Sequence, residues 1–171
     1  MTLASDGYAL TGLWFDGQKY FGTTLSPDSC EMSLPVFDET LSWLDTYFSG
    51  KDPRFTPRLR FQDTEFRSRV WKVLAGIPYG DTISYSGLAE AFLREYPGLY
   101  TSPRAIAGAV SHNPISLIIP CHRVIGKNGS LTGYAGGLEK KARLLDLEQA
   151  GKHKFTTPVL TGKQDPLKIH L

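Results

Sequence analysis

A proline-rich polar segment divides the chain into two parts, and it constrains the fold more than any other feature. Residues 51–57 read Lys-Asp-Pro-Arg-Phe-Thr-Pro, with two prolines and three charged side chains. Proline lacks a backbone N–H donor and disfavours helix at the residue before it, so the stretch favours an extended connection. We therefore predict an N-terminal domain over residues 1–57, a linker at about residues 51–60, and a second domain from residue 61.

The part before this segment combines a strand pattern with a helix pattern. Between residues 8 and 25, apolar and aromatic residues are interrupted by glycines at positions 7, 12, 17 and 22, which is typical of strands. Asp16-Gly17 lies between two of these runs and predicts a hairpin turn. A helix is predicted after Pro35, because apolar residues recur there at intervals of three and four. These residues are Phe37, Leu41, Leu44 and Phe48.

The part after the segment is predicted to be mostly helical. One helix begins near Thr64, which can cap its first turn, and a glycine ends it. A second starts near Ser84 and is broken by a Pro-Gly pair, and a third follows Ser102 at the cap and proline at the first helical position. A last helix is expected over residues 138–150. Two helices joined by a loop, the second preceded by Ser-Pro, fit a helix-turn-helix.

The third of these helices is unusually rich in small residues. Residues 104–110 read Arg-Ala-Ile-Ala-Gly-Ala-Val. Small side chains let a helix backbone approach another surface closely. That surface is either a neighbouring helix or the groove of a nucleic acid, in which case Arg104 would extend from the N-terminal end.

A proline-bounded Cys-His pair is the strongest chemical signal. The apolar run at residues 115–119, expected to be a buried strand, leads into Pro120-Cys121-His122-Arg123. Only a thiolate is a good nucleophile, so Cys121 needs a base such as His122, and the base needs an orienting carboxylate, for which Glu148 is a candidate. The alternative is a buried cysteine beside a structural histidine.

Charge is unevenly distributed along the chain. Residues 1–57 contain 3 Lys/Arg and 8 Asp/Glu, residues 58–150 contain 12 and 8, and the last 21 residues contain 4 and 1. A basic C-terminal part favours contact with a polyanion, although ordinary scatter of charge gives the same pattern. Residues 152–171, with two prolines and four lysines, are expected to form a loosely ordered tail.

Composition and cysteine content exclude several classes of protein. No apolar stretch reaches the roughly 18–20 residues that span a bilayer, and the first twelve residues do not predict a signal peptide. Two cysteines do not make a disulfide scaffold, so we expect a cytoplasmic location. No cysteine or histidine pair has zinc-ligand spacing, and no metal site is predicted.

Residues 64–150 resemble the catalytic domain of the O6-alkylguanine-DNA alkyltransferases, also called methylated-DNA–protein-cysteine methyltransferases. The resemblance implies a ribonuclease H-like α/β N-terminal domain, with a small antiparallel sheet and a helix, and a mostly α-helical catalytic domain over residues 61–151 with a winged helix-turn-helix. The matching stretches are residues 64–66, 70–71, 77–85, 104–105, 108–110, 113–114, 119–124, 129, 131–138 and 144–145.

The resemblance also implies a reaction. A monomeric repair enzyme without a cofactor would bind double-stranded DNA, extrude an O6-alkylguanine and move the alkyl group permanently onto Cys121; O4-alkylthymine is expected to react as well. By position, His122 would take the thiol proton through a water and Glu148 would orient His122. Asn113 would hold the cysteine segment against the DNA-binding helix, and Tyr85 would donate a hydrogen bond to the guanine.

Further residues are implied to contact DNA or the extruded base. Arg104 would fill the gap left in the base stack, backbone groups at Cys121 and Val124 would read the guanine edge, and the loop at Tyr134 would form a wall facing O6. The implied binding residues are Arg104, Ala105, Gly108, Val124, Tyr134 and Ala135.

The chain departs from the family pattern in two places, and two other functions stay open. About five extra residues lie around residues 96–101, in the turn of the helix-turn-helix, and Ala135 stands where some members have serine. A lesion-binding relative without chemistry would lack the acceptor cysteine, which is present as Cys121. A Cys-His hydrolase would leave the helix of Arg104 unexplained.

Overall fold

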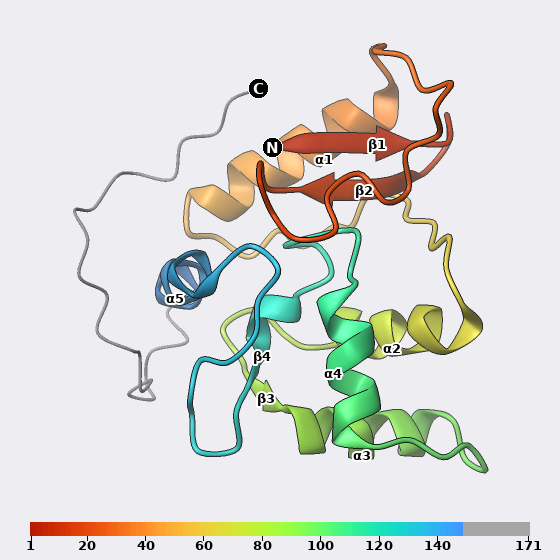
Figure 1. Ribbon diagram of the computed structural model, residues 1–171. Coiled ribbons are helices and arrows are strands. Elements are labelled where there is room, and N and C mark those ends of the chain that lie inside the picture. The colour runs from red at the N-terminus through yellow and green to blue at the C-terminus, as the bar shows by residue number, and fades with distance from the viewer. Residues whose placement is uncertain (149–171) are drawn as a thin grey trace.

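The computed structural model describes residues 1–148. The tail predicted over residues 152–171, and the last two residues of the helix predicted over 138–150, lie outside the described residues. Figure 1 shows a two-stranded sheet and a helix, α1, at one end, helices α2, α3 and α4 at the other, and α5 at the side.

The N-terminal sheet is an antiparallel hairpin, but it lies closer to the N-terminus than predicted. Strands β1 (Thr2–Ser5) and β2 (Leu10–Trp14) are joined by a turn in which Asp6 Oδ1 accepts hydrogen bonds from the backbone of Tyr8 and Ala9. The predicted hairpin at residues 16–17 is wrong, and residues 15–25 form successive turns instead of strands. The glycines at 17 and 22 take φ values of 72° and 71°, so local turn geometry replaces sheet pairing.

The predicted N-terminal helix is confirmed, although a different stripe faces the core. Helix α1 (Pro35–Phe48) begins at a proline and is followed by Gly50 with φ 78°. The residues expected to face the core, apart from Leu44, are only partly buried at its edge. The buried residues are Val36, Thr40, Trp43, Leu44 and Tyr47.

The segment predicted to link two domains packs on the sheet. Leu10 donates to the carbonyl of Arg58 (2.8 Å) and accepts from the amide of Arg60 (3.0 Å), so residues 58–60 pair with β2. Further along β2, Leu13 bridges to Ile115. Buried side chains of both parts, such as Leu13 and Trp71, belong to one hydrophobic cluster. The domain boundary itself stays a prediction.

Three C-terminal helices begin where their caps predicted. Helices α2 (Glu65–Ala75), α3 (Tyr85–Glu95) and α4 (Pro103–Ser111) pack against one another. The side chains of Thr64, Ser84 and Ser102 each accept a hydrogen bond from a backbone amide in the first turn. A last helix, α5 (Leu138–Leu147), follows a glycine-rich loop. No helix among residues 1–148 is long and apolar enough to cross a membrane.

The apolar run before Cys121 is buried as predicted, but it is not a strand. Leu117 has φ 69°, and the amides of Ile118 and Cys121 donate to carbonyls two residues back, which folds the run into tight turns. Flanking prolines cannot donate to a sheet ladder. The chain continues as a 3₁₀ helix (Cys121–Arg123) and then as β4 (Val124–Ile125), which pairs in parallel with β3 (Ile83–Ser84).

Candidate active site

Asn113 holds the folded run and Cys121 together. Its side-chain nitrogen donates to the carbonyls of Ile119 (2.8 Å) and Ile115 (3.3 Å) and lies 3.1 Å from Cys121 Sγ. Its oxygen accepts from the amide of Ile115 (3.0 Å). One buried amide therefore satisfies the backbone groups that a strand would have paired, and it directs the thiol.

The thiol of Cys121 is protonated at rest. The residue is 5% exposed, and burial raises the pKa of the Cys121 thiol, although the hydrogen bond from Asn113 and the charge of Lys141 oppose this shift. Within residues 1–148, no hydrogen bond joins the sulfur to the imidazole ring of His122. Formation of a thiolate therefore requires a base to remove the proton.

The geometry of His122 would allow it to act as that base. Its Nε2 lies 2.7 Å from Glu148 Oε1, and its Nδ1 has no hydrogen-bond partner in the described part of the chain. Because the carboxylate accepts a hydrogen bond from Nε2–H, the proton of the neutral ring stays on Nε2 and Nδ1 is left with a free lone pair. Burial lowers the pKa of His122 despite the hydrogen bond to Glu148, so the ring is neutral at pH 7 and can accept a proton.

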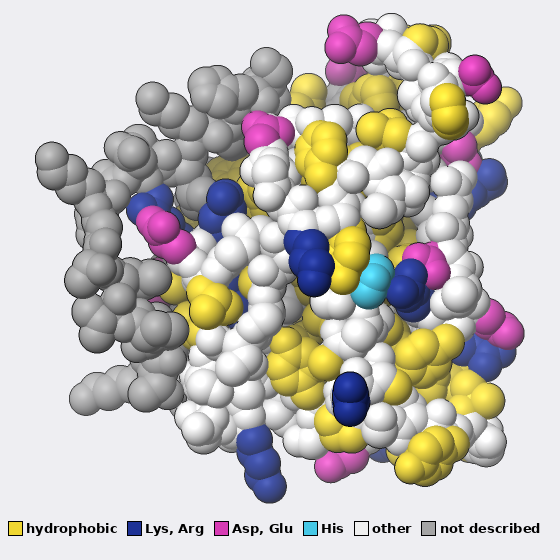
Figure 2. All heavy atoms as spheres, viewed as in Figure 1, with side chains coloured by type: hydrophobic (Ala, Val, Ile, Leu, Met, Phe, Trp, Pro, Cys, Tyr) yellow, Lys and Arg dark blue, Asp and Glu magenta, His cyan; other side chains and the backbone are white. Residues whose placement is uncertain are grey.

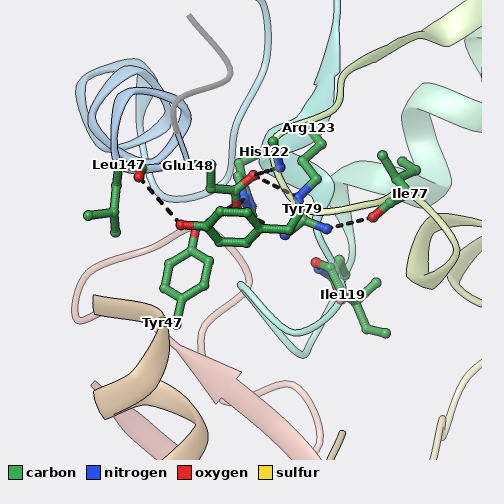
Figure 3. A network of polar contacts seen from close by, with 10 residues as sticks. Tyr47, Ile77, Tyr79, Ile119, His122, Arg123, Leu147 and Glu148 are labelled. Carbon is green, nitrogen blue, oxygen red and sulfur yellow. Dashed lines mark hydrogen bonds and ion pairs between the residues drawn. The ribbon is translucent and has the colours of Figure 1, made fainter. Parts of the chain in front are cut away.

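Glu148 is the centre of a buried polar network (Figure 3). Besides His122, it accepts hydrogen bonds from Arg123 Nε (2.9 Å) and Nη2 (3.0 Å), from the Tyr47 hydroxyl (2.7 Å) and from the amide of Gly80 (3.2 Å). Burial alone would raise the pKa of Glu148, but hydrogen bonds from His122 and Arg123 hold it at about 2. The carboxylate is therefore ionised under all ordinary conditions and fixes the histidine ring.

A pocket of about 330 Å³ leads to the cysteine. The Tyr85 hydroxyl lies at its wall and donates to the carbonyl of Thr132 (3.2 Å). Burial raises the pKa of Tyr85, so this phenol keeps its proton, which it can donate to a ligand by turning away from Thr132. The lining residues are Lys19, Tyr85, Ala107, Val110, Ser111, Cys121, Gly133, Tyr134 and Ala135.

Known proteins share this arrangement of sequence and fold. Residues 65–150 match the family model described as 6-O-methylguanine DNA methyltransferase, DNA binding domain. The methylated-DNA–protein-cysteine methyltransferase of Mycobacterium tuberculosis is 41% identical over 152 residues, which is 88% of this chain and 86% of the relative. This chain belongs to the methylated-DNA–protein-cysteine methyltransferase family.

Two further matches support this membership of the methyltransferase family. The methylated-DNA–protein-cysteine methyltransferase of Methanosarcina mazei is 48% identical over 123 residues, which is 72% of this chain and 75% of the relative. The crystal structure of Mycobacterium tuberculosis OGT in complex with DNA superposes with a TM-score of 0.72 at 40% identity, over 86% of this chain and 85% of that one. The small sheet and helices described above agree with an α/β N-terminal part followed by a helical C-terminal part.

Helix α4 of this methyltransferase-family chain has one side that packs on a neighbouring helix and another side that is exposed. Ile106 and Ala109 are buried, and Trp71 Nε1 donates to the carbonyl of Ala109 (2.9 Å), so this side packs closely on α2. The other side is exposed and includes the three predicted DNA contacts Arg104, Ala105 and Gly108. Figure 2 shows Lys and Arg side chains in the middle of the face on which α4 lies, whereas acidic side chains lie mainly toward its edges.

Val124 is placed differently from the other predicted binding residues. Its side chain is fully buried, it does not line the pocket, and its carbonyl accepts a hydrogen bond from Lys141 Nζ (2.6 Å). Tyr134 and Ala135 line the pocket. Residues 96–101, where the extra residues are predicted, lie in the loop between α3 and α4, and Tyr100 there is 92% exposed.

Three residues of the site were missed or left without a role. Tyr47 comes from α1 and reaches the His122–Glu148 pair across the predicted domain boundary, which no local pattern indicates. Arg123 stands in the Cys-His motif, yet its two bonds to Glu148 depend on tertiary structure. Lys141 has no exposed surface and donates to the carbonyls of Val124, Thr132 (2.9 Å) and Gly133 (3.2 Å).

Lys141 joins the cysteine segment to the pocket loop. Burial lowers its pKa to about 8, so the ammonium form still predominates at pH 7. A buried cation needs compensating acceptors, and the three carbonyls supply them. The sequence does not indicate that Lys141 is buried, because lysines in a helix usually lie on its exposed side.

Proposed function

We propose that this protein repairs double-stranded DNA by moving the alkyl group of an extruded O6-alkylguanine onto Cys121, once per molecule. The observation that carries this proposal is the buried thiol at the wall of a base-sized pocket, beside a histidine with a free Nδ1 and a carboxylate-bound Nε2. Membership of the methyltransferase family supplies the reaction class.

The chemistry follows from the atoms in place. His122 Nδ1 takes the thiol proton through one water, and the resulting thiolate attacks the saturated alkyl carbon. A sulfur–carbon bond forms as the bond from that carbon to O6 breaks, and its electron pair stays on the guanine. Tyr85 turns its hydroxyl from the carbonyl of Thr132 to the ring and gives it a proton as charge develops, so that guanine leaves as a neutral base. The proton that His122 took from the thiol replaces the phenol proton through water. O4-alkylthymine carries its alkyl group on an equivalent exocyclic oxygen and is included in the proposal.

The remaining site residues have positioning or DNA-binding roles in this proposal. Asn113 orients the thiol, and Glu148 fixes the tautomer of His122. The loop at Tyr134 and Ala135 forms the wall facing O6, and backbone groups at Cys121 and Val124 read the guanine edge. The exposed side of α4, with Ala105 and Gly108, would lie in the minor groove as the second helix of a winged helix-turn-helix. The N-terminal part would be the ribonuclease H-like domain, and the protein would act as a monomer in the cytoplasm.

Mass spectrometry of the intact protein after incubation with a methylated duplex tests the proposal. We expect a mass gain of one methylene group per molecule, on the peptide that contains Cys121, and at most one product per protein. A hydrolase would instead form many products per molecule, and a lesion-binding protein would keep its mass. Either of those results would contradict the proposal.

Arg104→Ala is expected to slow repair of duplex DNA about tenfold or more while leaving the reaction with free O6-methylguanine unchanged. Extruding a base costs a few kcal/mol, and a side chain that fills the gap offsets part of this cost, whereas the free base needs no extrusion. Single-turnover rates on the two substrates measure the difference. Equal losses on both would show that Arg104 does not act in the base stack.

A further inference from the structure

The loop at residues 18–20 is fixed to the catalytic half of the molecule at three consecutive positions. The Gln18 side-chain oxygen accepts from the hydroxyl of Ser116 (3.0 Å), in the run before the cysteine. The backbone amide of Lys19 donates to the carbonyl of Ala135 (3.0 Å), in the pocket loop. The ring of Tyr20 stacks on His112, at the end of α4, with 4.0 Å between ring centroids.

This anchoring is strong enough to hold an unfavourable backbone conformation. Tyr20 has φ 63°, in the left-handed region that bulky residues rarely adopt. Such conformations persist where surrounding contacts over-determine them, and they gather at binding sites. The stacked partner, His112, is itself held by its Nδ1 at 2.8 Å from the carbonyl of Gly108. The loop is therefore a built part of the pocket region.

The loop places one cation at the pocket. Lys19 lines it together with Cys121 and Tyr85, and within the described lining it is the only residue charged at neutral pH. Its side chain is exposed, its Nζ lies 4.9 Å from the ring centroid of Tyr20, and no carboxylate pairs with it in residues 1–148. Figure 2 shows an imidazole in contact with an apolar side chain, with Lys or Arg on both sides, in the middle of this face.

The chemistry of that position selects an anion. Uncharged groups such as the phenol of Tyr85 can hydrogen-bond the edge of a base. The unpaired ammonium of Lys19 is instead suited to bind a phosphate. Residues 1–57 are otherwise acidic, with three Lys/Arg against eight Asp/Glu, so general attraction to DNA does not account for a lysine here. An extruded nucleotide brings its own flanking phosphates to the pocket mouth.

We infer that Lys19 binds a backbone phosphate of the extruded nucleotide, so that the N-terminal part contributes directly to substrate recognition. This inference rests on the proposed function. The loop's backbone bond to Ala135 does not involve the lysine side chain, so Lys19 can be replaced without releasing the loop.

Four substrates separate the phosphate from the base: methylated duplex DNA, O6-methyldeoxyguanosine 3′,5′-bisphosphate, O6-methyldeoxyguanosine, and the free base. Lys19→Ala should slow alkyl transfer from the duplex and the bisphosphate about tenfold, as expected for loss of one charge-assisted hydrogen bond, and leave the nucleoside and the base unchanged. Lys19→Arg should keep most of the rate. The dependence of log rate on log salt for the duplex should lose about 0.9 in slope, equivalent to one phosphate contact.

A matched control is Lys72→Ala, which removes an exposed lysine of α2 that does not line the pocket, and it should leave the rates on the bisphosphate and the nucleoside unchanged. Equal loss on the nucleoside and the bisphosphate would overturn the inference, because Lys19 would then act on the base or the pocket wall. Unchanged rates on all four substrates would also overturn it. If the wild-type protein takes up no alkyl group from any of them, the proposed function itself fails, which is a separate result.

Discussion

Replacing Cys121 with alanine is expected to abolish alkyl transfer completely while leaving the affinity for lesion-bearing duplex within about threefold, a change below 1 kcal/mol. The alanine removes the attacking sulfur atom, which no other group in the pocket can replace. The exposed side of α4 should be unaffected, because Cys121 is 5% exposed and lies outside this helix. Intact-protein mass spectrometry measures transfer, and fluorescence anisotropy with a labelled methylated duplex measures binding.

The second cysteine supplies the control. Cys30 is exposed and does not line the pocket, so Cys30→Ala should take up one alkyl group per molecule at the wild-type rate. If Cys121→Ala still accepted an alkyl group, Cys121 would not be the nucleophile. Loss of DNA binding in that variant, with the fold intact by circular dichroism, would show that Cys121 has a structural role.

The C-terminal helices could be predicted from sequence because their boundaries depend on nearby atoms. Thr64, Ser84 and Ser102 each cap a helix through an amide three residues away, so the signal and the structure occupy the same few positions. The same holds for Pro35 at the start of α1. The site residues were predicted from the family resemblance, because they come from several separate segments and no single helix or strand contains them.

The errors arose where tertiary contacts replace regular hydrogen bonding. The run at residues 115–119 has the composition of a strand, but the amide of Asn113 satisfies its carbonyls and Leu117 turns the chain at φ 69°. Residues 15–25 likewise have the apolar content of strands, yet Gln18 accepts from the amide of Phe15 (2.9 Å) and closes a turn. Side-chain bonds of this kind leave no periodic trace in a sequence.

The polar groups around His122 and Glu148 could not be predicted for a related reason. Tyr47 lies 101 residues from Glu148 in the sequence, and it is one of several aromatic residues on α1. Helical spacing predicts that such a residue is buried but does not identify its partner. Lys141 could not be predicted because it is fully buried, whereas a lysine in a sequence is expected to be exposed.

Glu148→Gln is expected to cost about 3 kcal/mol of unfolding free energy at pH 7 and to slow alkyl transfer about 100-fold or more. A glutamine fills the same space, but its amide nitrogen faces donors from Arg123, Gly80 and Tyr47, so a buried guanidinium loses its counter-ion. The tautomer of His122 is then no longer fixed, and Nδ1 becomes a less reliable base.

The pH dependence of this stability loss distinguishes the charge from the shape of the side chain. The pKa of Glu148 is about 2 when folded, against an ordinary value of 4.5. Because the folded pKa is the lower one, the ionised carboxylate contributes its full stability above pH 4.5, and that contribution is lost as pH falls toward 2. A difference of about 2.5 units corresponds to about 3 kcal/mol. The gap between wild type and variant should therefore be large at pH 7 and small near pH 2.

Urea denaturation of both proteins at pH 7, 4 and 2.5 measures that gap directly, since each midpoint and slope yields a free energy. Glu139→Gln is the matched control: it removes the same charge from an exposed pair with Arg143 on α5, and surface pairs contribute only about 0.5 kcal/mol. A gap that stays constant across this pH range would mean that Glu148 stabilises the fold by its packing. A variant with wild-type stability at pH 7 would contradict the central role of the carboxylate altogether, because five donors converge on it in the interior of the protein.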